Sequence, residues 1–534
     1  MSRLTLVCSL FSSVCLLVLG AGVSAQAKPP ETPDSVTKGK GIYMQRCWFC
    51  HGREGDGNGP VADYLNPRPR DFTIGAYKLR TTQSGEVPLD EDLFRTLSEG
   101  IPGTAMQGFE GILTEEERRQ VIAFIKTFAG DLFEEPPERA EIGSAKSSSV
   151  DKGKEVYQRA KCWECHGQEG RGDGPSAAQL TDDWDLPILP ADLTKGWRFK
   201  GGNTATDIFT RFTTGMDGTP MPSFADVLSE EDRWNLATYV RSLIREPQAG
   251  GEPVVKSRRV NRDLPLDPDH PLWQEAETLN VPLSGQVIAA PRWQNHSVDL
   301  ITVRSLYNDE AIAFLLEWDD RFKDTVHTEE PLPAKDTYVK FNPQKKWSLR
   351  DAVEIQFPMR IPPGIERPYF LLGEPRKPVV LWRWNADWND DAHRKTAVEE
   401  LNATGPRKPV VPQPAEGQEV MGKGVWQDGR WRVVITRPLK PKNPDKDIGF
   451  EAGKMIPIAF HVWDGSNGER GLLSAISSWQ FLVLEAPTPA SVYLYALLVI
   501  VGCFGAELWL IRWARSRPAA LGGESSTDPA GASG

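Results

Sequence analysis

The sequence predicts a multidomain chain with two related all-α domains, then an antiparallel β-sandwich, then one transmembrane helix. Three observations predict this order: an internal repeat of about 115 residues, a series of short β-rich runs, and a 21-residue apolar stretch near the C-terminus. At 534 residues the chain is too long for a single core, and its length favours three or four domains.

The composition is that of an ordinary globular protein, with 40% apolar and 25% charged residues. The formal net charge of -11 argues against a nucleic acid or an anionic surface as a partner, because either would require a basic patch.

The N-terminus has the pattern of a secretory signal peptide over residues 1–25. A short basic region precedes the apolar run Leu4–Leu19, and small residues follow it at a cleavage site. A retained N-terminal anchor is the alternative. Export is therefore expected for the chain that follows.

The C-terminal stretch 491–511 carries one charge, Glu507, and is long enough to cross the hydrocarbon as a single helix. Arginines follow it directly, so the positive-inside rule places the tail 512–534 in the cytoplasm and the bulk of the chain on the extracytoplasmic side. The sequence predicts a single-pass protein of the cell membrane.

Two CxxCH motifs carry the chemistry of the repeat. They are Cys47-Trp48-Phe49-Cys50-His51 and Cys162-Trp163-Glu164-Cys165-His166. Positions i, i+3 and i+4 share one helix face, so both thiols can reach the vinyl groups along one porphyrin edge. The following histidine then becomes the proximal iron ligand. A zinc half-site and a redox dithiol are the alternatives, but a redox pair is expected in a βαβ context that neither motif has.

Met106 and Met221 are the expected sixth iron ligands. Each follows its motif histidine, His51 or His166, by 55 residues, and each ends a Gly-Thr-x-Met loop. A thioether raises the potential and leaves no open coordination position. The alternative is a methionine that fills a gap beside the ring. Met216 is a rival for Met221, although it aligns with an isoleucine in the first copy.

Longer strings around the motifs match as well. CWFCHGREGDGNGP and CWECHGQEGRGDGP, the PRDFT and PADLT stretches around Asp71 and Asp192, the methionine loops and the closing helices together resemble class I cytochromes c. The resemblance covers roughly residues 34–133 and 148–246, and the two domains are placed at 34–133 and 151–246. It implies a helical bundle around each heme, with crossed N- and C-terminal helices.

Polar linkers are predicted over 134–150 and 247–262, and an antiparallel sandwich over 263–486. Short β-rich runs punctuated by Pro, Gly, Asn and Asp predict the sandwich. These runs are Val298–Tyr307, Ala311–Trp318, Ala352–Phe357, Val379–Trp384, Arg430–Ile435, Ile456–Trp463 and Ser477–Leu484.

Four sequence strings follow one another in the C-terminal half of the chain. They are DAVEIQFP at 351–358, PYFLLGEPRKPVVLWRWNADW at 368–388, GRWRVVITRPL at 429–439 and IPIAFHVWDGSNGER at 456–470. As a set they resemble the heme-binding domain of the ethylbenzene dehydrogenase γ subunit family. That family implies an electron-transfer subunit of a periplasmic molybdenum enzyme related to dimethyl sulfoxide reductase, such as selenate or chlorate reductase. Related domains occur in nitrite oxidoreductase complexes.

In that family a Met and a Lys hold a noncovalent b heme. At the expected positions this chain has Leu371 and Leu372, and later the run Gly471-Leu472-Leu473-Ser474. Leucine cannot donate to iron, so the sequence argues against the family's heme b. Four substitute ligands exist, for each of which a packing or surface role is favoured: His461, His393, Met359 and Met455.

The sequence therefore predicts a membrane-anchored diheme c-type cytochrome that transfers electrons between a periplasmic oxidoreductase and the respiratory chain. The expected partners are molybdenum/iron–sulfur oxidoreductase subunits, and other cytochromes or a terminal oxidase. No catalytic residues are predicted, and a non-catalytic subunit is favoured over an enzyme. Two alternatives stay open. One is a diheme peroxidase-type enzyme, which needs one exchangeable distal position. The other is a binding module whose sandwich recognises a sugar or a protein.

Overall fold

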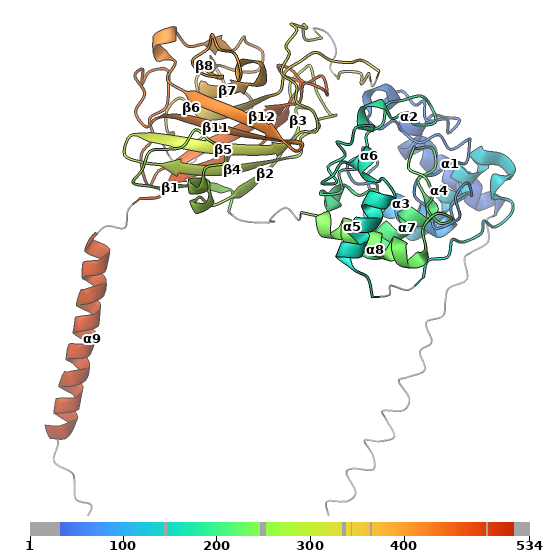
Figure 1. Ribbon diagram of the computed structural model, residues 1–534, viewed down its shortest axis with the longest axis horizontal. Coiled ribbons are helices and arrows are strands. Elements are labelled where there is room, and N and C mark those ends of the chain that lie inside the picture. Colours follow the sequence, from blue (N-terminus) through green and yellow to red (C-terminus); the bar gives the residue numbers. More distant parts are fainter. Residues whose placement is uncertain are drawn as a thin grey trace, which may run out of the picture.

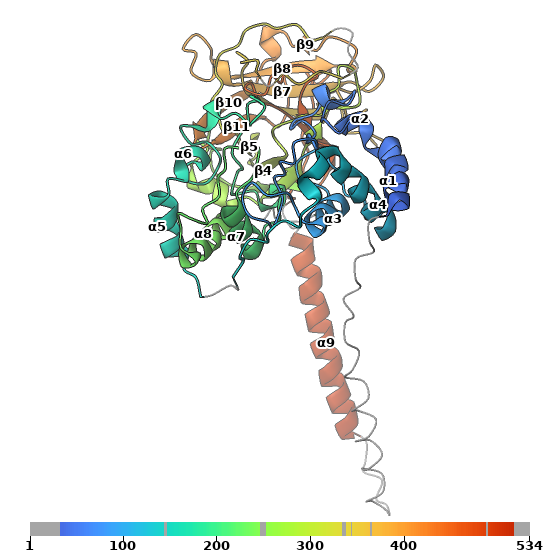
Figure 2. The ribbon, with the colours of Figure 1, turned by 90° about the vertical axis from the view of Figure 1, so that its right-hand side faces the viewer.

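The computed structural model describes residues 32–143, 147–245, 252–333, 338–342, 344–363, 366–486 and 490–516. The predicted signal peptide and the tail from residue 517 lie outside these residues. Figures 1 and 2 show a helical part beside a layered β domain, with one long helix extending away from the β domain.

The helical part is built from two copies of one four-helix pattern. The first copy has α1 (Pro33–Arg46), α2 (Trp48–His51), α3 (Asp90–Glu99) and α4 (Glu115–Lys126), and the second has α5 (Val150–Arg159), α6 (Trp163–His166), α7 (Ala205–Thr214) and α8 (Glu230–Leu243). The closing helices begin at hydroxyl caps, because Thr114 and Ser229 accept hydrogen bonds from backbone N–H groups of the first turn. Short 3-10 turns lie at Ala62–Tyr64, Thr127–Phe133, Ala177–Gln179, Gly196–Arg198, Pro271–Glu275, Ala386–Trp388 and Ala415–Gly417.

In each copy the first helix crosses the last one, α1 on α4 and α5 on α8. Glycine permits this approach. A Cβ atom at Gly39 would lie 1.9 Å from the Gln120 carbonyl oxygen, and one at Gly153 would lie 2.1 Å from the Asn235 carbonyl oxygen. The helix crossing expected from the resemblance is confirmed, and both copies achieve it in the same way.

The β domain holds fourteen strands within the described residues. They are β1 (Val254–Arg259), β2 (Leu279–Pro282), β3 (Ser284–Gly285), β4 (Leu300–Tyr307), β5 (Ala311–Asp319), β6 (Ala352–Pro358), β7 (Val379–Asn385), β8 (Val398–Ala403), β9 (Val411–Pro412), β10 (Met421–Gln427), β11 (Arg430–Pro438), β12 (Met455–Trp463), β13 (Ala475–Ile476) and β14 (Gln480–Leu484). All seven predicted runs form strands: β4, β5, β6, β7, β11, β12 and β14.

The strands form two layers that share strand β12. One layer runs β10-β11-β5-β4-β1-β14, and the other runs β6-β7-β8-β9. The first half of β12 pairs with β14 and the second half pairs with β6. Between the layers lies an apolar core in which Trp318, Trp382, Trp384 and Trp431 are fully buried. Aromatic packing across the core therefore holds the sandwich together.

Strand β1 corrects the sequence prediction in two respects. It lies inside the stretch 247–262 that was predicted to be a linker, and it pairs in parallel with both β14 and β4. The sandwich is therefore a mixed sheet rather than a purely antiparallel one. Val255 and Ser257 are buried between the neighbouring strands, whereas the lysine and arginines of β1 are less buried. Only the partner strands make this short, charged segment a strand.

Buried polar contacts join the two helical domains. Arg80 of the first domain is 0% exposed, donates to the Thr214 carbonyl at 2.7 Å, and pairs with Asp217 at 2.7 Å. Arg211 of the second domain donates in return to the Lys78 carbonyl at 3.1 Å. Charged hydrogen bonds shielded from water are strong and directional, so they fix how the two domains sit against each other.

The β domain contacts both helical domains. Asn295 donates to the Tyr64 carbonyl of the first domain at 2.9 Å. Lys195 of the second domain lies 3.3 Å from Asp299, and Arg171 pairs with Asp319 at 2.9 Å. The three domains therefore form one connected assembly.

Helix α9 (Ala490–Ser516) contains the predicted span 491–511. Its mean hydropathy of 2.2 and its length are sufficient to cross a membrane, and none of that window is buried against the rest of the described chain. An apolar helix left uncovered in this way fits a membrane anchor.

Candidate functional site

A cavity of about 410 Å³ lies in the first helical domain. Cys47, Cys50, His51 and Met106, the four residues predicted for the first site, all line it. The volume falls within the range of small-molecule and cofactor pockets. Its apolar walls come from several elements and include Phe72, Tyr77, Leu93, Leu97, Phe109 and Ile122.

The CxxCH segment forms a single helical turn in each copy. The Cys47 carbonyl accepts from the His51 N–H at 2.9 Å, and the Cys162 carbonyl accepts from the His166 N–H at 2.9 Å. Burial raises the pKa of Cys47 to about 12 and that of Cys162 to about 11. A reactive dithiol requires a lowered thiol pKa, so these environments do not favour the redox alternative.

Both motif histidines are oriented by a backbone carbonyl. His51 Nδ1 lies 3.0 Å from the Arg70 oxygen, and His166 Nδ1 lies 2.9 Å from the Ala191 oxygen. A carbonyl only accepts, so Nδ1 carries the proton and Nε2 keeps its lone pair for a metal. Burial lowers the pKa of both histidines, which favours the neutral form that a metal ligand requires.

The two methionine loops have the same backbone pattern. The Met106 N–H donates to Thr104 Oγ1 at 3.1 Å, and the Met221 N–H donates to Thr219 Oγ1 at 3.2 Å. Met221 packs against the apolar cluster that also contacts Cys162. Met216 donates its N–H to the Met221 carbonyl, just as Ile101 does to Met106. Met216 therefore has the backbone role of Ile101, and Met221 has that of Met106.

Five cationic side chains also line the first cavity: Arg46, Arg68, Arg70, Lys78 and Lys200. Lys200 comes from the second helical domain. Burial lowers the pKa of Lys78 to about 7 and that of Lys200 to about 8. The sequence analysis missed these residues. Alignment of the PRDFT and PADLT strings could have flagged Arg70 and Lys78, but only the packing of the domains brings Lys200 to this cavity.

In the β domain, leucines occupy the positions where the family resemblance expects the ligands of heme b. Leu371 and Leu372 are 1% and 7% exposed, and Leu472 packs against the same apolar cluster. Of the substitutes, His461 is buried against Glu354 with its Nδ1 3.1 Å from a carboxylate oxygen, while Met455 is 54% exposed. These contacts give the leucines and His461 packing and pairing roles.

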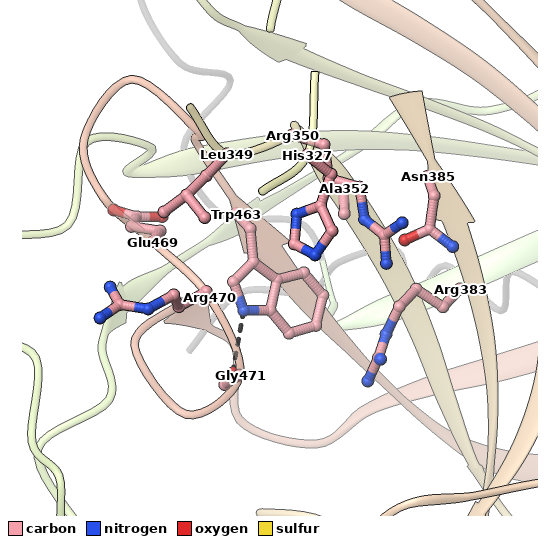
Figure 3. Close-up of a pocket in the computed structure, with 10 residues that line it drawn as sticks. All are labelled: His327, Leu349, Arg350, Ala352, Arg383, Asn385, Trp463, Glu469, Arg470 and Gly471. Atoms are coloured by element: carbon pink, nitrogen blue, oxygen red, sulfur yellow. Dashed lines mark hydrogen bonds between the residues drawn. The ribbon is translucent and has the colours of Figure 1, made fainter. Parts of the chain in front are cut away.

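A small pocket of about 70 Å³ lies beside Trp463 in the β domain (Figure 3). The Trp463 indole donates to the Gly471 carbonyl at 2.9 Å, and His327 lies next to the indole ring. Arg383 and Arg470 lie on either side of them (Figure 3). The volume holds a few water molecules but not a porphyrin.

Comparison with known families agrees with both resemblances. The family model described as cytochrome c matches residues 36–129 and 150–243, and the model described as ethylbenzene dehydrogenase matches 270–399 and 380–475. The chain carries two cytochrome c domains and an ethylbenzene dehydrogenase domain. Cytochrome c domains imply heme c, so the chain is a heme protein of electron transport.

Individual proteins are similar to parts of the chain. A Haloferax mediterranei protein named as a respiratory nitrate reductase heme subunit is 26% identical over 260 residues, which are 47% of this chain and 83% of that protein. The chlorate reductase subunit gamma of Ideonella dechloratans is 28% identical over 167 residues, 31% of this chain and 57% of that protein. A solved structure of a reducing HAO-like protein complex from Kuenenia stuttgartiensis contains a chain that is 46% identical, with 41% of this chain and 100% of that chain covered, at a TM-score of 0.39.

Proposed function

We propose that this chain is a membrane-anchored electron-transfer subunit with one covalent heme c in each cytochrome domain. It exchanges electrons between a periplasmic molybdenum oxidoreductase and the respiratory chain. One observation carries the proposal: Cys47, Cys50, His51 and Met106 all line a single cavity of cofactor size.

Each heme is held by two thioethers and two iron ligands. Cys47 and Cys50 attach the first heme, and His51 and Met106 ligate its iron. The second set is Cys162, Cys165, His166 and Met221. The bound group supplies a one-electron change at iron. The chain's own residues hold the imidazole in the Nδ1–H tautomer and fix the methionine loop through a threonine hydroxyl.

Two protein ligands on each iron leave no position for a substrate, so the hemes transfer electrons without binding one. This distinguishes the relay from the diheme peroxidase alternative, which requires one exchangeable distal side. The names of the nitrate and chlorate reductase relatives, a heme subunit and a gamma subunit, support an oxidoreductase complex. We assign the partner subunits to the molybdenum/iron–sulfur class, with other cytochromes or a terminal oxidase at the far end.

Helix α9 anchors the assembly, with the tail in the cytoplasm and the cytochrome domains on the periplasmic side. Arg512 and Arg515 near its C-terminal end support this orientation by the positive-inside rule. The net charge of -11 fits a soluble acidic ectodomain.

The ethylbenzene dehydrogenase domain carries no b heme and acts in docking. Leu371, Leu372 and Leu472 support this, because they pack against one apolar cluster and offer no donor atom to iron.

The test is a heme count on the mature full-length protein extracted from membranes. We expect a pyridine-hemochrome spectrum of c-type heme alone, two hemes per chain by mass spectrometry, and no carbon monoxide binding by the folded reduced protein. Unmodified Cys47, Cys50, Cys162 and Cys165 under conditions of active cytochrome maturation would overturn the proposal. Rapid carbon monoxide binding would favour the peroxidase instead, and b-type heme would contradict the docking role. Identification of co-purifying subunits tests the partner class.

A further inference from the structure

Three buried aspartates meet at one end of the sandwich. Asp320, Asp351 and Asp464 are 3%, 0% and 8% exposed, and one carboxylate oxygen from each lies within 4.8 Å of the others. They come from distant parts of the chain. Asp320 directly follows β5, Asp351 directly precedes β6, and Asp464 directly follows β12. The cluster therefore joins the two layers of the sandwich.

The carboxylates of this cluster form no salt bridge with any described residue, although the buried Arg321 guanidinium interacts electrostatically with Asp464. Within the described residues, none of the three carboxylates has a lysine or arginine nitrogen within ion-pair distance. Asp351 accepts from Trp431 Nε1 at 2.9 Å and from backbone N–H groups, and Asp464 accepts from Ser466 Oγ at 2.6 Å. Neutral donors of this kind do not offset three buried charges.

Asp320 provides the second, separate observation. Its Oδ1 accepts from the Phe322 N–H at 3.2 Å, but its Oδ2 is buried and accepts no hydrogen bond from any described residue. The Oδ2 atom of neighbouring Asp324 is also buried and unsatisfied. A buried carboxylate oxygen without a partner costs folding free energy unless a ligand outside the chain satisfies it.

We propose that Asp320, Asp351 and Asp464 bind one calcium ion that ties together the ends of β5, β6 and β12. The donors are all oxygen atoms, which hard cations prefer, and the cluster contains no histidine or cysteine to select zinc or copper. Magnesium keeps several of its waters, so a buried cluster favours calcium.

Without a cation, burial and mutual repulsion favour the protonated form of Asp320 and Asp351. Burial first, and then the neighbouring aspartates, raise the pKa of Asp320 and Asp351 well above the ordinary value. Burial and Asp464 raise the pKa of Asp324 to about 7. A bound cation reverses both effects and keeps the carboxylates ionised. The competing state is a cluster of protonated carboxyls without metal.

The location gives the ion a structural role at a domain interface. Asp319, next to Asp320, pairs with Arg171 of the second cytochrome domain at 2.9 Å. Arg321 lies against the loop after the second CxxCH motif, because a Cβ atom at Gly172 would be 3.1 Å from its guanidinium carbon. Calcium therefore rigidifies the segment on which the second cytochrome domain rests. This goes beyond electron transfer and does not depend on it.

The experiment uses the full heme-loaded protein, first depleted with a calcium chelator and then titrated with calcium chloride. We expect about one calcium per chain by elemental analysis before depletion, and a Tm that rises with added calcium. At a calcium concentration 100 times its Kd, the folding equilibrium constant should increase about 100-fold. Terbium should bind competitively and show luminescence sensitised by Trp431, whose indole contacts Asp351.

Asp320→Asn should abolish the calcium-dependent rise in Tm. The matched control is Asp309→Asn, whose side chain is 79% exposed and pairs with Arg259; it should retain the calcium response. If Asp320→Asn does not fold, metal content and terbium competition in the unmodified protein still decide the question. Sub-stoichiometric calcium together with a Tm unaffected by chelation and calcium would overturn the site and favour protonated carboxyls.

Discussion

The two cytochrome domains share one local design but have different surroundings. In both, a buried tyrosine, Tyr43 or Tyr157, donates to the carbonyl of the glycine that ends the CxxCH turn, at 2.7 and 2.6 Å. The first cavity, however, receives Lys200 from the second domain, whereas the loop after the second motif rests on the ethylbenzene dehydrogenase domain. On the proposed ligation, the repeat provides the same iron ligands in both domains, and the neighbouring domains set the charge around each heme and the contacts of each CxxCH loop.

Part of the difference in charge follows from single positions, although Arg321 of the β domain acts on His166 as Arg70 acts on His51. When the PRDFT and PADLT strings are aligned on Asp71 and Asp192, Arg70 and Lys78 of the first domain correspond to Ala191 and Phe199 of the second. Cations near a heme favour the reduced state, because reduction removes one positive charge from the iron. We therefore expect two separate reduction potentials, with the first heme as the higher.

The largest expected change in the difference between the two hemes comes from replacing one predicted methionine ligand at a time. Met106→Ala should lower the potential of the first heme alone, by on the order of 0.1–0.2 V, because axial ligands dominate the potential of a heme. The opened position should also bind carbon monoxide. Met221→Ala should do the same to the second heme. Redox titration followed by visible spectroscopy measures both, and the untouched heme is the internal control. Unchanged spectra in either variant would refute that ligand assignment.

The contact between the two cytochrome domains can be tested at the buried ion pair of Arg80 and Asp217. Asp217→Ala leaves this fully buried guanidinium without its carboxylate, and we expect the variant to lose about 3 kcal/mol of stability. Urea unfolding monitored by heme absorbance measures the loss. The control is Glu99→Ala, which removes an exposed pair with Arg95 and should cost less than about 0.5 kcal/mol. Equal effects in the two variants would mean that the buried pair does not hold the domains.

The ion pairs between the second cytochrome domain and the ethylbenzene dehydrogenase domain should contribute less stability at low pH. Burial alone would raise the pKa of Asp319, but Lys195, Arg430 and Arg171 hold it at about 2. A folded-state pKa below the unfolded value of about 4 contributes stability above pH 4 that is lost as pH falls towards 2. The contribution is about 2 kcal/mol. Asp319→Asn should be less stable than the parent by this amount at pH 6, and the two stabilities should converge near pH 2. A difference independent of pH would contradict the ionic origin.

Local motifs identify the candidate heme residues, whereas the other features of the site depend on long-range packing. The CxxCH turns, the Gly-Thr-x-Met loops and seven strands follow from spacing within short windows. Strand β1 was missed because the string VVKSRR becomes a strand only between β4 and β14. Asp320, Asp351 and Asp464 follow or precede separate strands, and only the closed sandwich brings them together. Lys200 depends on how two domains dock. Sequence periodicity does not encode such contacts.

The smallest expected effect on the difference between the two hemes comes from replacing Lys200, which belongs to the second domain but lines the cavity of the first. Lys200→Gln removes a cation from the first cavity and leaves all four predicted heme residues in place. At an effective dielectric constant of about 20, one charge removed near the iron should lower the first potential by about 50 mV. The second potential should not change. Lys195→Gln, in the same segment but paired with Asp299 in the β domain, is the matched control and should leave the first heme unaffected. If both variants shift the first potential equally, the effect comes from movement of the segment and not from the charge of Lys200.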